Sequence, residues 1–151
     1  MAKFIFKLEN ILSIKYKLEE QAKAEYSIEI HKLRTEQQKL ERLKEKMELY
    51  EEKLFDAVKD TLDIFNIKSL EDAVENIKYN IRLQMVVIKN QEIITEKARA
   101  KLDAAMKERK IYEKLKEKAF EKFKEEINAQ EQKEINELVS FRFRSAEESE
   151  D

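Results

Sequence analysis

The 151-residue sequence contains no glycine, proline, cysteine or tryptophan. Without glycine there is no phosphate-cradling loop, no dinucleotide-binding fingerprint and no tight hairpin turn of the usual kind. Without proline and glycine, a many-stranded sheet lacks the residues that normally separate its strands. Without cysteine, neither a disulfide framework nor a thiolate metal site can form, which suits a cytoplasmic protein. These absences argue against nucleotide-binding loops, β-sheet folds and disulfide-stapled folds.

Long hydrophobic runs are also missing. The longest covers residues 85–88, whereas a membrane-spanning helix needs roughly 20 apolar residues. The start of the chain is briefly apolar, but Lys7 and Glu9 interrupt any signal-peptide core. We therefore expect no insertion into a membrane.

Charged residues are abundant and balanced. They make up 42% of the chain, and 31 Lys and Arg against 33 Asp and Glu leave a formal net charge of −2. Glu, Lys, Leu, Ile and Ala dominate the rest of the composition, which is typical of long helices and coiled coils. The sequence therefore predicts an all-α protein.

A seven-residue repeat of apolar side chains indicates the first helix. Its members are Leu33, Leu40, Met47 and Leu54, with Leu43, Tyr50 and Ala57 three residues after the last three. An earlier stripe consists of Phe4, Leu8, Ile11, Leu18 and Ala22. Because Leu18 and Leu33 are 15 residues apart rather than 14, we expect the supercoil to relax between them. We predict one helix over about 3–65.

Residues 66–69 have the composition of a turn. Asn66 tolerates the left-handed conformation, and Ser69 followed by Asp72 matches a capping box. A second helix is predicted over about 70–144. Its apolar stripe comprises Ile77, Ile81, Ile88, Ala98, Leu102, Ala105, Tyr112, Ala119, Phe123, Ile127, Ile135, Leu138 and Phe141. Residues 145–151 are acidic and predicted to be a disordered tail, so residues 1–144 form a single domain.

The short connection predicts that the two helices fold back on each other as an antiparallel coiled-coil hairpin. The expected pairs are Leu54 with Ile81, Met47 with Ile88, Leu33 with Leu102, and Leu8 with Ile127. Five polar residues fall on or beside the second stripe: Gln84, Gln91, Thr95, Arg109 and Lys116. Either these residues fix the register of the seam between the helices, or they face an outside partner.

No residue pattern indicates catalysis, a cofactor or a metal. His31 is the only histidine and has no cysteine to complete a transition-metal site. Most carboxylates alternate with lysines at helical spacing, which is typical of a solvated, ion-paired face. A straight two-helix hairpin also lacks a concave pocket in which a pKa could be shifted. We predict that the protein is not an enzyme.

A basic stretch keeps nucleic acid among the alternatives. Residues 89–124 contain 12 basic and 7 acidic residues, a local excess of positive charge that could follow a phosphate backbone. The whole chain is slightly acidic, however, and a phosphate-binding domain is usually clearly basic. An acidic protein partner fits the stretch equally well, and no nucleic acid is expected.

Four segments resemble the bacterial flagellar export protein FliJ. Residues 4–12 place aromatic and leucine side chains before a charged helix, and residues 17–22 continue it with small residues. Residues 77–88 follow a helix-capping serine, as in the family. Residues 132–144 are similar to the family's basic and acidic ending, with Asn136 in place of the customary aspartate. The resemblance covers essentially the whole chain.

This resemblance implies a stalk-like component of flagellar type III protein export. Members of the family are cytoplasmic coiled-coil hairpins that bind a hexameric export ATPase ring and contact the export gate protein at the inner face of the membrane. They are also reported to handle export chaperones. Carried over to this sequence, the gate surface comprises Leu43, Met47, Tyr50, Ile77 and Gln84. The exposed tip expected to enter the ring comprises Ile135, Leu138, Phe141, Arg142 and Arg144.

Three other functions remain open from the sequence. The chain could be the equivalent stalk of an injectisome or a V-type ATPase. It could also be a purely structural coiled coil that dimerises, or a helical arm that binds nucleic acid. Each of these alternatives uses the same helices and differs only in the partner.

Overall fold

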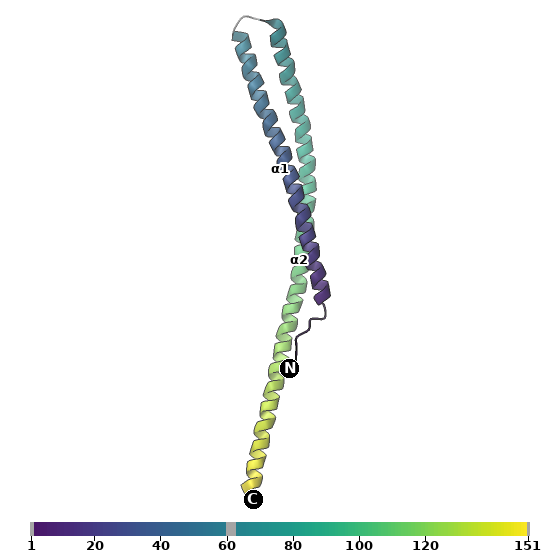
Figure 1. Cartoon of the computed structure of the whole chain (residues 1–151), viewed down its shortest axis with the longest axis vertical. Coiled ribbons are helices and arrows are strands. Elements are labelled where there is room, and N and C mark those ends of the chain that lie inside the picture. The colour runs from purple at the N-terminus through teal and green to yellow at the C-terminus, as the bar shows by residue number, and fades with distance from the viewer. Residues whose placement is uncertain (1, 60–62, 151) are drawn as a thin grey trace. The chain divides into compact units, whose positions relative to one another are not determined.

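The computed structural model describes residues 2–59 and 63–150, which form two helices and no strand (Figure 1). Helix α1 spans Glu9–Lys59 and has 51 residues. Helix α2 spans Ile64–Glu150 and has 87 residues. The two helices contact each other, so the fold is an all-α helical hairpin. The predicted fold class is confirmed.

The hairpin divides into two units, which are described separately. The turn unit comprises Glu20–Ala104, and the terminal unit comprises Met1–Glu19 together with Ala105–Asp151. Each unit contains part of both helices. In both units, the residues that are at least half-buried alternate at steps of three and four, as in a coiled coil.

The seam of the turn unit is a regular heptad. On α1 it consists of Ala22, Tyr26, Glu29, Leu33, Glu36, Leu40, Leu43, Met47, Tyr50, Leu54 and Ala57. On α2 it consists of Leu70, Val74, Ile77, Ile81, Gln84, Ile88, Gln91, Thr95, Ala98 and Leu102. The predicted extra residue between Leu18 and Leu33 was wrong, because Leu18 is exposed and glutamates continue the repeat.

The seam of the terminal unit is shorter and more polar. From α1 it includes Leu12, Lys15 and Glu19, and from α2 Ala105, Arg109, Tyr112, Lys116, Ala119 and Phe123. Residues 2–8 are not helical and lie against α2. The ring of Phe4 packs on Phe120 and Phe123, with ring centres 5.1 and 5.4 Å apart.

The predicted start of the first helix near residue 3 is therefore too early, because α1 begins at Glu9. In the non-helical segment before it, Phe4 contacts both Phe120 and Phe123, while Glu9 forms an ion pair with Lys116.

The connection between the helices also lies earlier than predicted. Asp63 precedes α2 and caps it: its carboxylate accepts a hydrogen bond from the backbone N–H of Asn66 at 3.3 Å. Residues 66–69, predicted to be the turn, are therefore helical. Residues 60–62, predicted to be helical, lie outside the described residues. Residues 145–150, predicted to be a disordered tail, continue α2.

Because the turn is shifted, the predicted register is wrong. Pairing Leu33 with Leu102 would bring Gln84 opposite residue 51, but Gln84 bonds Glu36 instead. Gln91 likewise bonds Glu29. A connection closer to the start of the chain pairs each residue of α1 with an earlier residue of α2.

Candidate partner-binding surfaces

The turn unit contains a ladder of amide–carboxylate hydrogen bonds inside its seam. Gln84 donates through Nε2 to the backbone oxygen and the carboxylate of Glu36, at 2.9 and 2.6 Å. Seven residues later, Gln91 makes the same pair of bonds to Glu29, at 3.2 and 2.6 Å. Thr95 donates to the backbone oxygens of Glu29 and Gln91. This repeat fixes the register, because a slipped helix would leave these groups without partners.

The bonds of the ladder also favour the charged form of Glu36. The hydrogen bond from Gln84, followed by that from Lys39, lowers the pKa of the Glu36 carboxyl below its ordinary value. Gln84 and Gln91 therefore contact α1, as the register interpretation predicts. Thr95 does the same through the backbone oxygen of Glu29.

The terminal unit uses charged groups at the corresponding positions. Arg109 binds Glu19 across the seam through two of its nitrogens, one of them at 3.3 Å. It also binds Glu113 on its own helix at 2.8 Å. Tyr16 donates a hydrogen bond to Glu113. Together these four residues form a network, the Arg109 cluster, which holds α1 against α2.

The pKa shifts in this cluster reflect the shared bonds. The hydrogen bond from Tyr16, followed by the charge of Arg109, lowers the pKa of Glu113 against an opposing effect of burial. The hydrogen bond to Glu113 raises the pKa of Tyr16, and the bond to Glu19 raises that of Arg109. Both Arg109 and Lys116, left open in the sequence analysis, bind glutamates of α1.

The five residues of the predicted gate surface do not form one exposed patch. Ile77 is only 3% exposed and belongs to the core of the turn unit. Leu43, Met47 and Tyr50 are half-buried along the seam of α1. Gln84 bonds α1, but part of its side chain is accessible beside Leu43. Of the five, Leu43 and Gln84 share a surface groove.

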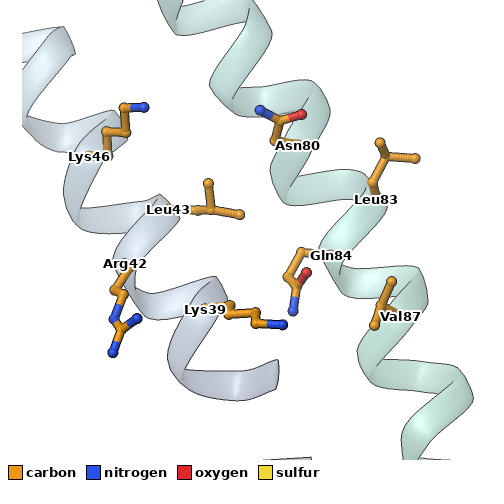
Figure 2. A pocket seen from close by; sticks show the side chains of 8 residues that line it. All are labelled: Lys39, Arg42, Leu43, Lys46, Asn80, Leu83, Gln84 and Val87. Atoms are coloured by element: carbon orange, nitrogen blue, oxygen red, sulfur yellow. The ribbon is translucent and has the colours of Figure 1, made fainter. Parts of the chain in front are cut away.

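Figure 2 shows this groove between the two helices of the turn unit. Leu43 points from α1 towards α2, and Gln84 points back towards α1 beside Lys39. The other lining residues are Arg42 and Lys46 on α1 and Asn80, Leu83 and Val87 on α2. The lining thus combines leucine and valine side chains with three cationic ones and no carboxylate.

The groove continues into an exposed apolar face of α2 that was not predicted. Its members are Tyr79, Leu83, Val86, Val87 and Ile94, each between 44% and 59% exposed. They recur at helical spacing but lie beside the seam rather than in it. The spacing of these residues can be read from the sequence, but they alternate with the seam residues of α2. The sequence analysis therefore did not distinguish this second apolar face from the seam.

The tip residues predicted to enter a ring are all exposed. Ile135, Leu138 and Phe141 are 52%, 61% and 71% exposed, and Arg142 and Arg144 lie beside them. Val139 and Phe143, not predicted, are equally accessible. The described N-terminal segment reaches only the start of this region, where Ala2 lies beside Gln130, Glu131 and Glu134. Residues 135–150, at the yellow end of α2, are all exposed (Figure 1). This end presents apolar side chains on several sides of one helix.

Neither described helix contains a stretch long and apolar enough to cross a membrane. Within residues 2–59 and 63–150, no three His, Asp or Glu side chains gather as metal ligands would. His31 lies exposed on α1.

Together, the fold and these surfaces define a class of protein: a helical hairpin that offers partners a groove and an exposed helix end. The family model described as "Flagellar FliJ protein" matches residues 4–148, and the chain belongs to this family. No curated protein and no solved structure matches the chain. The family is a non-catalytic component of flagellar protein export. The chain is therefore a flagellar export component whose partners belong to the export machinery.

Proposed function

We propose that the protein binds the hexameric export ATPase ring through the end of α2 and the membrane export gate through the groove of the turn unit. The observation that carries this proposal is the exposed apolar end of α2. Ile135, Leu138 and Phe141 project from the last part of α2, where every described residue from 135 to 150 is exposed. Apolar side chains gathered in this way are typical of surfaces that bind other proteins.

The ring contact uses Ile135, Leu138, Phe141, Arg142 and Arg144. A single helix with apolar residues on several sides fits an enclosing partner, such as a ring pore, better than a flat one. The two arginines add contacts to acidic groups that exchange readily, because ion pairs near the surface are weak.

Truncation tests the ring contact. Ending the chain after Gln132 should abolish ring binding and stimulation of the ATPase. A chain ending after Arg144 is the matched control, since it keeps all five residues and should behave as the full chain does. Stimulation by the shorter chain would refute the ring contact.

The gate contact uses the groove lined by Leu43, Gln84, Leu83 and Val87, and Met47 and Tyr50 extend it along α1. Lys39, Arg42 and Lys46 border these apolar groups, so a partner with acidic residues around an apolar contact fits best. Ile77 is buried and does not line the groove, so it is not part of the proposed contact.

A charge in the groove tests the gate contact. Leu83→Glu should weaken gate binding at least tenfold, because it places a carboxylate where apolar contact is needed. Ile28→Glu is the matched control, since Ile28 lies on α1 of the same unit with comparable exposure (56% against 49%). Equal binding by both variants would exclude this groove.

Two further elements complete the proposed role. The protein works in the cytoplasm, peripherally associated with the inner face of the membrane at the flagellar base, and it escorts export chaperones. Co-purification from cells with each chaperone in turn tests the escort role. Recovery of the ATPase and gate proteins without any chaperone would remove it from the proposal.

A further inference from the structure

The polar contacts between α1 and α2 differ in kind between the two units. In the terminal unit three of them join opposite charges: Lys15 with Glu108 at 3.3 Å, Arg109 with Glu19, and Lys116 with Glu9 at 2.8 Å. Tyr16 adds one bond from a neutral donor, to Glu113. In the described part of the turn unit, the corresponding donors are all neutral, namely the side chains of Gln84, Gln91 and Thr95. The seams of the two units are thus closed by different chemistry.

Fewer apolar residues are buried in the terminal unit than in the turn unit. Leu12 is buried here, against Ala22, Val74, Ile77 and Ile88 in the turn unit. The other apolar residues of the terminal seam are half-buried: Ala105, Tyr112, Ala119, Phe123 and Ile127, with Phe4 packed on Phe123. Because apolar burial is smaller, we expect the ion pairs to contribute a larger share of the stability here than in the turn unit.

Salt acts selectively on such contacts. The attraction between partly exposed charges is screened over about 10 Å at 0.1 M salt and over about 3 Å at 1 M. Hydrogen bonds from neutral amides and buried isoleucines respond far less. Terminal segments that are held by few contacts also open before the rest of a structure does.

We propose that residues 2–19 form a salt-sensitive latch, which detaches from α2 while the turn unit stays paired. Detachment leaves α2 intact as a helix and uncovers the side chains that the latch holds, among them Arg109, Tyr112, Lys116 and Phe123. The latch is independent of the proposed ring and gate contacts, because none of its residues belongs to either surface.

Amide hydrogen exchange of the full chain tests the latch directly. Raising NaCl from about 0.1 M to about 1 M should increase the exchange of residues 9–19 about fivefold, as expected when ion pairs worth up to about one kcal/mol are screened. Exchange of residues 29–54 should change less than about twofold. Equal responses in both ranges, or none in residues 9–19, would overturn the proposal.

Charge variants separate the latch from a general loosening of the hairpin. Glu19→Gln at low salt should reproduce part of the effect of high salt on residues 9–19, and the further response to salt should be smaller than in the original chain, because only the pairs Lys15–Glu108 and Lys116–Glu9 remain. Its matched control is Glu36→Gln, which removes a charge from the same helix in the turn unit and should leave residues 9–19 unchanged. Opening of residues 9–19 by Glu36→Gln would contradict the latch.

A charge swap supplies a rescue. Lys116→Glu faces Glu9 with a like charge and should open the latch about fivefold. Glu9→Lys combined with Lys116→Glu restores opposite charges and should return exchange to within about twofold of the original chain. Failure of the swap to rescue, together with an unchanged salt response, would mean that the ion pair does not hold the latch.

Discussion

The turn unit and the terminal unit follow the same heptad but fill it differently. In the turn unit, isoleucine, leucine and valine occupy ten of the 21 seam positions and none carries a lysine or an arginine, and Val74, Ile77 and Ile88 are buried. In the terminal unit, charged residues occupy four of the nine helical seam positions. The comparison teaches that heptad spacing alone fixes where two helices touch, whereas the side chains at those positions decide how firmly they hold.

The largest effect should come from the turn-unit core. Ile77→Ala removes a side chain that is 3% exposed and should lower the free energy of unfolding by about 3 kcal/mol. Leu12→Ala is the counterpart in the terminal unit, also at 3% exposure. If the terminal unit is held less firmly, Leu12→Ala should lower the global unfolding midpoint in urea less than Ile77→Ala does. Equal shifts would break the comparison.

Arg109 tests the charged half of the seam. Arg109→Met keeps an unbranched apolar stem but leaves Glu19 and Glu113 without their shared cation. We expect a loss of protection in residues 9–19 that is larger than for any other single charge in the terminal unit. The loss should shrink at high salt, since salt weakens the original pairs as well. Hydrogen exchange at two salt concentrations measures both effects.

The sequence predicted the hairpin and much of the seam, and the misses have physical causes. Leu33, Leu40, Met47 and Leu54 revealed the heptad because they are apolar. Glu29 and Glu36 sit in the same repeat but were not recognised, since their burial depends on glutamines of α2. A search for polar residues at heptad positions on both helices would have matched them and given the correct register.

The candidate surfaces were predicted unevenly for a related reason. The tip residues were identified correctly as exposed, because the first helix has no apolar residues left to pair with them. Leu83 and Val87 were missed, while Ile77, which was named both in the apolar stripe and in the gate surface, is buried in the seam. Sequence spacing groups residues on a face but does not reveal which of two adjacent faces the partner helix covers. That choice depends on which side chains pair across the seam, as Gln84 does with Glu36.

Asp63 variants test how much the cap at the start of α2 contributes to stability. Asp63→Ala removes the carboxylate that accepts the N–H of Asn66 and should cost about 1 kcal/mol. The loss should appear as faster exchange at the start of α2, with residues 9–19 unaffected. Asp63→Asn keeps an acceptor oxygen and should stay close to the original stability. A destabilised Asp63→Asn variant would point to charge rather than capping.

The smallest expected effect is the loss of stability of each unit in acid, which should differ between the two units. The pKa values of Glu36 and Glu113 both lie below the ordinary value of 4.5 in the folded chain. A lowered folded pKa means that the stabilisation is complete above pH 4.5 and is lost as the pH falls through the folded value.

Glu36→Gln should reduce this acid-induced loss of stability in the turn unit at any salt concentration, since the pKa of Glu36 is lowered mainly by the hydrogen bond from the neutral side chain of Gln84. Glu113→Gln should reduce the acid-induced loss of stability in the terminal unit. The reduction should be larger at low salt than at high salt, because the charge of Arg109 contributes to the lowered pKa of Glu113. Urea unfolding combined with hydrogen exchange between about pH 6 and about pH 3.5 resolves the two contributions. A salt-independent response of Glu113→Gln would show that the hydrogen bond from Tyr16, and not the ion pair, controls acid sensitivity in the terminal unit.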